Sequence, residues 1–344
     1  MFLASDNTSG AAPGILAAIV AANDGYATSY GNDTLMADVR ARLREVFEAP
    51  EAAIYLVATG TAANALALAT LAPPWSAIYC HREAHVELDE CNAPEFFTGG
   101  AKLTLIDGAH GKIDPEALAE TLAGAAPAEV HHPQPGALSL TNVTELGGVY
   151  TPDEIARLTA LARARGLPCH LDGARFANAL VATGATPAEM TWKAGIDAVS
   201  FGGTKNGCLG VEAVILFDPA KAWEFELRRK RGAHLFSKHR FLSAQMAAYL
   251  DGGLWLDLAH RANAAAARLA VGLGALPGVR LVHPVEANMI FAALPRAMRD
   301  AARAAGAAFH DWADADGPAP QARLVCSWST TEADIAAFLA ACRT

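Results

Sequence analysis

Short, almost continuous apolar runs alternate in the first two thirds of this chain with longer stretches in which apolar residues recur at helical spacing. Runs of the first kind predict buried strands, and stretches of the second kind predict helices. The predicted strands cover residues 51–58, 76–80, 102–106, 137–142, 167–172 and 195–202, and the predicted helices cover 14–22, 61–71, 115–123, 151–165 and 187–194. Strands that alternate with helices favour parallel pairing. We therefore expect a mostly parallel central sheet in a large α/β domain spanning residues 1–244.

The remaining residues, 245–344, show a different order of elements. The alanine-rich stretch 246–273 predicts one long helix, and the sequence Ala-Asp-Gly-Pro-Ala-Pro at 315–320 predicts a loop. The other predicted elements are strands at 279–282, 289–294 and 323–328 and helices at 296–305 and 331–342. This part is expected to form a small C-terminal α+β domain.

Composition narrows the classes of function. The 344 residues carry a formal net charge of −9, and 52% of them are hydrophobic. An acidic chain lacks the basic surface that neutralises phosphates, so we expect neither nucleic acid nor a membrane as the main partner. The six cysteines form no CxxC pair, and the first ten residues do not resemble a secretion signal. These features are typical of a globular cytoplasmic enzyme with reduced thiols.

One lysine is chemically distinctive. Lys205 follows the predicted strand 195–202 in the glycine-rich turn Gly-Gly-Thr-Lys-Asn-Gly, and Asp172 stands at the end of the preceding predicted strand. A lysine can bind pyridoxal 5′-phosphate covalently as an imine. A carboxylate can keep the pyridine nitrogen of that cofactor protonated, so that the ring accepts electrons. A strand-end Asp followed by a strand-end Lys therefore indicates this cofactor.

Such a cofactor needs an anchor for its phosphate. The predicted strand 51–58 leads into Thr-Gly-Thr-Ala-Ala-Asn, which opens a helix at Gly60, Thr61 and Ala62. Free N–H groups and the helix dipole at such a start favour an anion. The chain contains neither GxxxxGK[ST] nor a complete GxGxxG fingerprint, which excludes those nucleotide-binding loops. A purely structural corner would look the same, and the downstream Asp172 and Lys205 favour the phosphate interpretation.

Two histidines, His81 and His85, are spaced like zinc ligands on one helix face. In the zinc protease motif a glutamate stands beside one of the histidines, whereas Glu83 lies midway between them. We therefore expect no metal site. His85 is either a surface histidine or, as we favour, a ring that stacks on the cofactor and takes part in proton transfer.

Several segments in order along nearly the whole chain resemble the low-specificity L-threonine aldolases, which are fold-type-I enzymes dependent on pyridoxal phosphate in the β-eliminating lyase and threonine aldolase family. The segments are SDNTSG, the run Tyr30-Gly31-Asn32-Asp33, TGTAAN, EAHVELDECNAPEFF, HLDGARFANA, TWKAGIDAVSFGGTKNG and ARLVCSWST. The resemblance implies cleavage of L-threonine, L-allo-threonine and related β-hydroxy-α-amino acids to glycine and an aldehyde. It also implies a homodimer or homotetramer with shared active sites.

The resemblance assigns roles to residues of this chain. Lys205 matches the lysine that binds the cofactor, Asp172 the carboxylate at the pyridine nitrogen, and Arg175 the arginine near the phenolic oxygen. The remaining expected cofactor contacts are Gly60, Thr61, Ala62, His85, Thr204 and Lys238. Lys205, His85 and Asp172 are the expected catalytic residues.

The expected substrate contacts are Ser5, Tyr30, Thr144 and Arg323. Arg323 matches the arginine that binds the substrate carboxylate, and bidentate geometry suits that ligand. Ser5 matches a serine facing the same carboxylate. Tyr30 and the basic segment 228–240 match regions that in relatives reach the site of a neighbouring subunit, and Arg231, Lys238 and Arg240 are the alternatives for the phosphate contact in this segment.

One position departs from the family. Many relatives carry a histidine by the substrate hydroxyl where this chain has Thr144. Threonine is not a general base at neutral pH, so the hydroxyl proton is expected to go to His85, to a bound water or to another group such as His132. Two other functions stay open: another fold-type-I reaction, such as β-elimination or transamination, and a non-catalytic scaffold.

Overall fold

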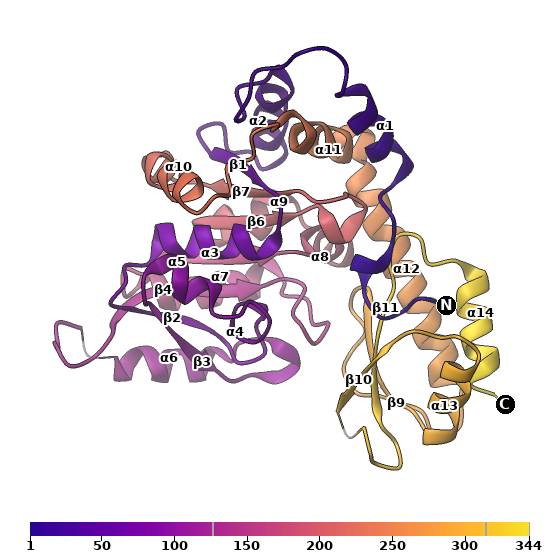
Figure 1. The fold of residues 1–344 in the computed structure, drawn as a ribbon. Helices are drawn as coiled ribbons and strands as arrows, with labels where there is room; N and C mark the ends of the chain where they lie inside the picture. The colour runs from indigo at the N-terminus through magenta and orange to yellow at the C-terminus, as the bar shows by residue number, and fades with distance from the viewer. Residues whose placement is uncertain (126, 314, 344) are drawn as a thin grey trace.

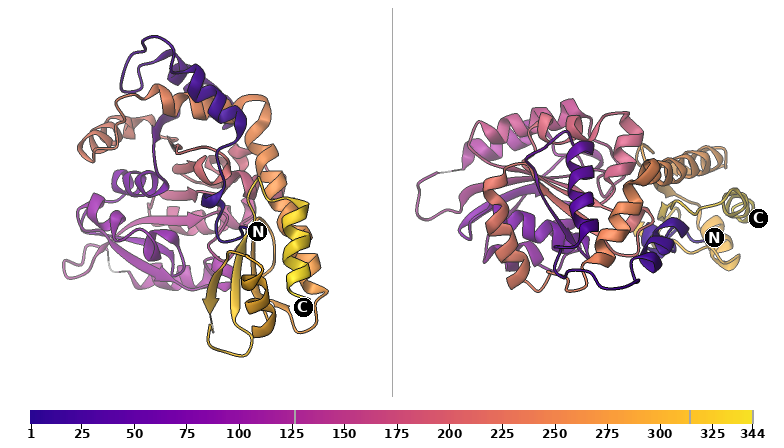
Figure 2. Two further views of the ribbon diagram at one scale, coloured as in Figure 1. Left: turned by 45° about the vertical axis from the view of Figure 1, so that its right-hand side comes forward. Right: turned by 90° about the horizontal axis from the view of Figure 1, so that it is seen from above.

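A computed structural model of the chain describes residues 1–125, 127–313 and 315–343. These residues form a larger part and a smaller part, each built around its own sheet (Figures 1 and 2). No helix in the described ranges is both long and apolar enough to cross a membrane.

The larger part contains a seven-stranded sheet in the order β1-β7-β6-β5-β4-β2-β3. Its strands are β1 (Ala53–Val57), β2 (Ser76–His81), β3 (Lys102–Ile106), β4 (Gln134–Thr141), β5 (Cys169–Gly173), β6 (Ala198–Gly202) and β7 (Glu212–Leu216). The strand β7 runs antiparallel to both neighbours, and the other strands share one direction. The mostly parallel sheet is thus confirmed, with β7 as a strand that the sequence analysis missed.

Helices cover both faces of this sheet (Figure 1). Alternate residues of β1 show how the two layers form, because Ile54 and Leu56 belong to one apolar core whereas Tyr55 and Val57 belong to another. The longer helices are α1 (Pro13–Ala21), α2 (Thr34–Val46), α3 (Gly60–Leu71), α6 (Pro115–Gly124), α7 (Pro152–Arg163), α8 (Phe176–Thr183), α10 (Ala222–Arg231) and α11 (Arg240–Leu250). Shorter ones are α4 (His85–Leu88), α5 (Ala93–Thr98) and α9 (Pro187–Met190).

The smaller part is an antiparallel sheet in the order β10-β11-β9-β8 with helices packed against it. Its elements are α12 (Leu254–Gly274), β8 (Arg280–Leu281), β9 (Met289–Ala293), α13 (Arg296–Ala304), β10 (His310–Ala313), β11 (Gln321–Val325) and α14 (Glu332–Ala341). The predicted α+β character is confirmed. The N-terminal segment joins this sheet: the Leu3 N–H donates to the Ala308 carbonyl, the Val325 N–H donates to the Leu3 carbonyl, and the Leu3 side chain is fully buried in this core.

The predicted helix at 246–273 is wrong as a single element. The structure breaks it at Asp251–Gly253, so that α11 ends at Leu250 and α12 starts at Leu254. Gly252 and Gly253 have φ values of 56° and 75°, a left-handed conformation that ends a helix and that glycine adopts at little cost. The first turns of α12 pack in the core of the larger part and its later turns in that of the smaller part. A domain boundary near residue 245 stays a prediction.

Candidate active site

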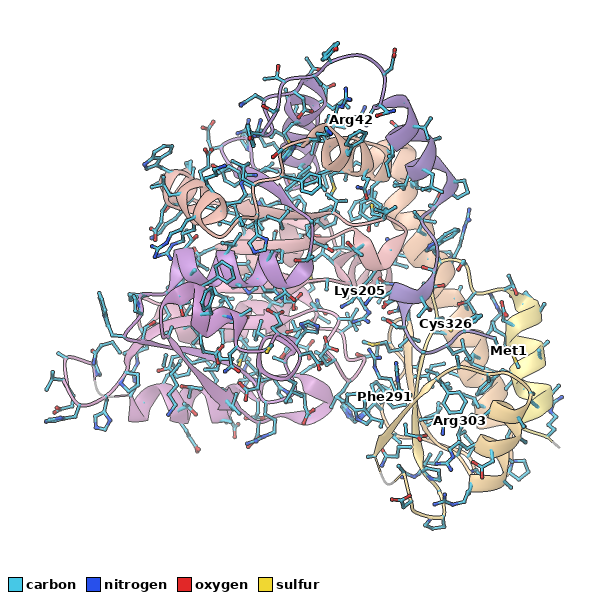
Figure 3. The ribbon with its side chains drawn as sticks, in the orientation of Figure 1. Met1, Arg42, Lys205, Phe291, Arg303 and Cys326 are labelled. Carbon is cyan, nitrogen blue, oxygen red and sulfur yellow. The ribbon has the colours of Figure 1, made fainter. Side chains whose placement is uncertain are left out.

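Side chains from several strand ends meet where the larger part, the smaller part and the N-terminal segment come together, around Lys205 (Figure 3). A cavity of about 230 Å³ lies there. Its lining consists of Asn7, Ala58, Thr59, Gly60, Thr61, His85, Ala174, Thr204, Lys205 and Glu212. Five predicted site residues, Gly60, Thr61, His85, Thr204 and Lys205, therefore lie together although they are distant in the sequence.

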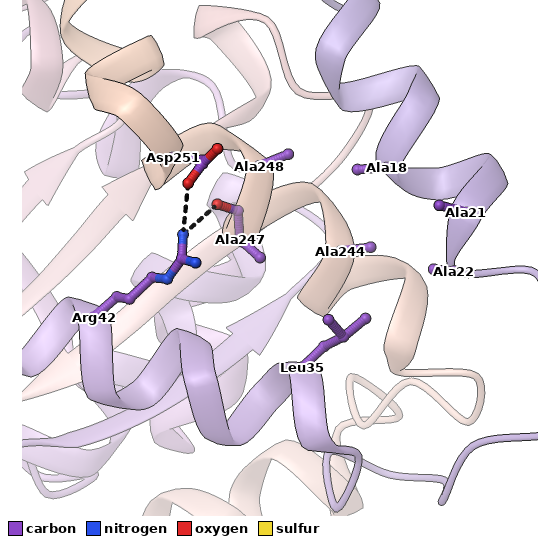
Figure 4. A pocket seen from close by; sticks show the side chains of 9 residues that line it. All are labelled: Ala18, Ala21, Ala22, Leu35, Arg42, Ala244, Ala247, Ala248 and Asp251. Carbon is purple, nitrogen blue, oxygen red and sulfur yellow. Dashed lines mark hydrogen bonds and ion pairs between the residues drawn. The ribbon is translucent and has the colours of Figure 1, made fainter.

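Size alone does not locate this site. A larger hollow, about 400 Å³, lies between α1, α2 and α11 (Figure 4). Its lining is mostly alanine, and its charged residues Arg42 and Asp251 bind each other at 3.3 Å. That hollow therefore offers no reactive group.

The turn that carries Lys205 is held by close backbone contacts. A Cβ on Gly202 would collide with the carbonyl of Ala174, and one on Gly203 would lie 2.7 Å from the carbonyl oxygen of Val211. Only glycine permits these approaches. The Asn206 side chain then donates hydrogen bonds to the Tyr249 hydroxyl and to a backbone carbonyl, both at 2.7 Å. These contacts fix the position from which Lys205 enters the cavity.

A chain of hydrogen bonds links Asp172 to His85. Asp172 accepts one bond from the Asn64 amide at 2.9 Å and another from the Ala174 N–H at 3.0 Å. Asn64 also donates to Glu90 at 2.8 Å, and the same Glu90 oxygen lies 2.8 Å from Nδ1 of His85. Burial raises the pKa of Glu90, and the hydrogen bond to Glu90 raises the pKa of His85. The ring of His85 is thus oriented through Nδ1, which leaves Nε2 for other partners.

The first residues of α3, Gly60 and Thr61, form the expected anion-binding site at the helix N-terminus, named the anion corner below. Thr59 caps the helix by accepting a hydrogen bond from the Ala62 N–H at 3.2 Å, while Gly60 and Thr61 line the cavity. The space around Gly60 is open, since a Cβ there would meet no atom within 4 Å. The expected role of Ala62 does not fit this geometry, because its amide is already used by Thr59 and its side chain is buried in the core.

Arg175 lies beside the site in a buried ion pair with Asp6. Two hydrogen bonds, at 2.6 and 3.0 Å, join the guanidinium to the two carboxylate oxygens, and Asn288 donates a third bond to Asp6 at 3.1 Å. Burial alone would raise the pKa of Asp6, but Arg175 and Lys205 more than offset this effect and lower it. The expected contact of Arg175 with the cofactor stays a prediction.

Arg323 on β11 is a partly buried guanidinium with weak partners. It reaches the Ala4 carbonyl at 3.5 Å and the Met289 sulfur at 3.6 Å, and its carbon lies 5.9 Å from the centre of the Trp312 ring. Its Nε is buried without a hydrogen-bond partner, and no carboxylate forms an ion pair with it within the described residues. Ser5, the residue after Ala4, accepts a hydrogen bond from the Asn7 N–H at 3.1 Å. Arg323 therefore has donors left for an additional acceptor.

Thr144 does not lie at the cavity, contrary to its expected place by the substrate hydroxyl. Its side chain is buried, donates to the His110 carbonyl at 2.8 Å and accepts from the Gly148 N–H at 2.9 Å. Both capacities of the hydroxyl are thus used within a backbone turn. His132, another expected proton acceptor, lies in the loop before β4, at the edge of the sheet where β4 starts, whereas Lys205 follows the end of β6, which runs in the same direction.

Two further predicted residues lie outside the cavity of their own chain. Tyr30 is half-exposed with the Lys230 ammonium 5.2 Å from its ring centre, and Lys238 is exposed in the loop after α10. His81 uses both ring nitrogens in backbone contacts, with the Gly108 carbonyl and the Glu83 N–H. Across the described ranges no three His, Cys, Asp or Glu side chains cluster as metal ligands would.

The sequence analysis missed four polar residues of this region: Asp6, Asn64, Glu90 and Glu212. Asn64 carried a usable signal, because it is a lone amide among the apolar residues of α3. A buried amide requires polar partners. The others gave no signal, since acidic residues at these positions would also suit a solvated surface.

Comparison with known proteins agrees with this geometry. The family model described as β-eliminating lyase matches residues 3–295. The chain belongs to this family. It is 41% identical over 332 residues to the low-specificity L-threonine aldolase of a Pseudomonas species, covering 96% of this chain and 94% of the relative, and 41% identical over 327 residues to that of Pseudomonas aeruginosa, covering 95% and 92%. A solved structure of Leishmania major threonine aldolase superposes with a TM-score of 0.94 at 26% identity and covers 99% of this chain and 98% of that one.

These relatives confirm the predicted family, the fold type and pyridoxal 5′-phosphate as the cofactor. The residues present fit that group: the cavity holds a lysine, an open helix N-terminus for the phosphate, and a histidine for the ring. Asp172 lies next to this cavity through Ala174. The prediction of a pyridoxal-phosphate-dependent threonine aldolase is thus confirmed at the level of the family.

Proposed function

We propose that this protein cleaves L-threonine, L-allo-threonine and related β-hydroxy-α-amino acids to glycine and an aldehyde, with pyridoxal phosphate bound at Lys205. Arg323 carries the proposal. Its guanidinium is partly buried, and its Nε has no hydrogen-bond partner among the residues that the structure describes. A buried unpaired charge is costly, and a carboxylate ligand satisfies a guanidinium by two parallel hydrogen bonds. The α-carboxylate of an amino acid has this chemistry.

The contacts of the site support the other roles. The cofactor, when bound, supplies an electron sink for the bond that breaks. Lys205 holds it before substrate arrives, and Asp172, itself held by Asn64, favours a proton on the pyridine nitrogen. Arg323 fixes the substrate carboxylate and thereby orients the Cα–Cβ bond. His85, whose Nδ1 binds Glu90, is assigned as the acceptor of the β-hydroxyl proton at Nε2.

We further propose a homodimer or homotetramer whose sites are shared between subunits. Tyr30 and Lys238 support this arrangement, because neither lines the cavity of its own chain and both have exposed side chains. Mixing two inactive variants, Lys205→Ala and Lys238→Ala, should restore part of the activity through hybrid oligomers. An active monomer in sedimentation experiments would contradict the proposal. A cytoplasmic location is also proposed, and the absence of disulfides among the six cysteines agrees with it.

The activity test uses purified protein with L-threonine and pyridoxal phosphate, with glycine, acetaldehyde, pyruvate and ammonia measured together. We expect glycine and acetaldehyde in equal amounts, and no turnover by Lys205→Ala. Arg323→Lys keeps the charge but loses the bidentate fork, so KM should rise by about tenfold or more with a smaller change in kcat. Formation of pyruvate and ammonia in place of glycine would refute the proposed reaction.

A further inference from the structure

Glu212 is a buried acidic residue that lines the cavity and has none of the roles proposed above for the reaction. It begins β7 and pairs with Val57 at the end of β1 on one side and with Gly202 at the end of β6 on the other. β1 leads to the anion corner, and β6 leads to Lys205. Because β7 runs antiparallel to both neighbours, its first residue lies at the edge where they end. The side chain of Glu212 therefore lies between the two halves of the cofactor site and lines the cavity.

The partners of Glu212 are neutral donors. The Gly203 N–H donates to Oε2 at 2.9 Å, and the Thr204 hydroxyl also binds the carboxylate. No ion pair of Glu212 occurs among the residues that the structure describes. Burial raises the pKa of Glu212 to about 7, while the bonds from Thr204 and Gly203 and the charge of Lys205 act in the opposite direction. The carboxyl group thus changes its charge near neutral pH.

Among the described residues, the titratable groups Lys205, Asp172, Cys208 and Tyr249 interact electrostatically with this carboxyl group, and His85 lines the same cavity. Burial raises the pKa of Cys208 and that of Tyr249 well above their usual values, so both are neutral at physiological pH. Lys205 favours the charged form of Glu212, and Asp172 favours the neutral form. A phosphate bound at the anion corner would add a strong influence of the same sign as Asp172.

An anion at Gly60 and Thr61 would share a cavity of about 230 Å³ with Glu212. Two negative groups in one small, poorly solvated space repel each other, and protonation of one of them lowers the electrostatic free energy. We infer that Glu212 is a positioning residue of the cofactor site, which holds a proton whenever the phosphate of the cofactor is bound. A neutral carboxyl group has one O–H donor for a phosphate oxygen, and its other oxygen still accepts from Gly203. In this state Glu212 couples the phosphate to the turn that carries Lys205.

The inference rests on the cofactor and not on the choice of substrate, so its test uses binding. Pyridoxamine 5′-phosphate is the probe, because it has the same phosphate but no aldehyde to react with Lys205. It is titrated into apoenzyme between pH of about 6.5 and 8.5 by calorimetry. Binding that requires a proton on a group with a pKa near 7 should weaken by about 25-fold over this range, relative to Glu212→Gln. The glutamine side chain keeps an oxygen that accepts from the Gly203 N–H but does not titrate. Dividing the dissociation constant of wild type by that of Glu212→Gln at each pH cancels the titration of the probe itself.

A second probe separates the phosphate from the ring. Pyridoxamine, which has no phosphate, should show the same pH dependence with wild type and with Glu212→Gln. Equal pH dependence of the two proteins toward pyridoxamine 5′-phosphate, or an equal difference between them toward both probes, would overturn the inference. If Glu212 served only to accept the hydrogen bond from the Gly203 N–H, wild type and Glu212→Gln would show equal pH dependence, because glutamine can accept that bond as well.

A third measurement does not depend on folding of the Gln variant. In Lys205→Ala, Glu212 is the carboxyl group that lines the cavity within the described residues, and its pKa is higher than in wild type because the lysine charge that lowers it is gone. Binding of pyridoxamine 5′-phosphate at a pH of about 8, measured in buffers of different ionisation enthalpy, should take up a measurable fraction of one proton, because part of Glu212 already carries a proton once the lysine charge is removed. Absence of proton uptake would overturn the inference. Failure to bind the probe at any pH would instead refute the cofactor site on which the inference depends.

Discussion

The buried pair between Asp6 and Arg175 gives a quantitative test of how the N-terminal segment is held at the site. The exposed fractions of the two side chains are 1% and 2%. In Asp6→Asn the guanidinium keeps its place but loses its counter-ion, and breaking a buried pair in this way costs about 3–5 kcal/mol in the free energy of unfolding. The matched control is Asp251→Asn, which breaks the Arg42–Asp251 pair in Figure 4, where 45% and 76% of the side chains are exposed. An exposed pair of this kind contributes roughly 0–1 kcal/mol.

Equilibrium urea unfolding of the apoproteins measures both variants, at one protein concentration because assembly changes apparent stability. The pH dependence supplies a second check. Because the pKa of Asp6 is lowered in the folded protein, its stabilising contribution is present above the unfolded pKa of about 3.9 and is lost as the pH falls through the folded pKa. The difference between wild type and Asp6→Asn should therefore shrink in strong acid. If Asp6→Asn costs no more than Asp251→Asn at neutral pH, the reasoning is refuted.

Three other measurements test the site and its support. Glu90→Gln keeps the shape of the link to His85 but removes the charge, so the pKa of His85 should fall in an NMR titration and kcat should drop by on the order of tenfold or more; an unchanged pKa would contradict this account. Thr144→Val should lower the free energy of unfolding by about 1–3 kcal/mol and change kcat by less than about tenfold, because the hydroxyl serves a backbone turn; a large loss of kcat at constant stability would show the opposite. Burial lowers the pKa of His170 to about 4, below the unfolded value, so stability should decline by up to about 3 kcal/mol as the pH falls from about 6.5 toward 4, and His170→Gln should reduce that decline.

The sequence predicted the parallel strands well, since fully buried strands appear as continuous apolar runs. The strand β7 has the same appearance, Glu-Ala-Val-Ile-Leu, but it is short and follows a turn, and the direction of a buried strand leaves no mark in its composition. The break at Asp251–Gly253 was visible as a Gly-Gly pair. The high alanine content on both sides favoured one continuous helix, so the Gly-Gly pair was not interpreted as a helix break.

The site was predictable as far as its residues stand at strand ends. Lys205 and the corner at Gly60 follow buried strands directly, and parallel strands bring such positions to one edge. The hydrogen bonds from Asp172 through Asn64 to Glu90 join a strand, a helix and a loop. No spacing along the chain encodes such a contact. For Thr144, the local turn decided the outcome, because it buries the hydroxyl that the resemblance to the family had placed near substrate.

The N-terminal segment has a consequence for the order in which this protein assembles during synthesis. Leu3 completes the core around β11, and its backbone bonds join Ala308 and Val325, residues that are synthesised long after Leu3. Ala12, in contrast, bonds to Gly207 in the larger part. Leu3 must therefore remain unburied during synthesis until residues 308 and 325 have emerged. A nascent chain stalled before residue 308 would present a formed larger part with a free N-terminal arm, open to proteases and chaperones.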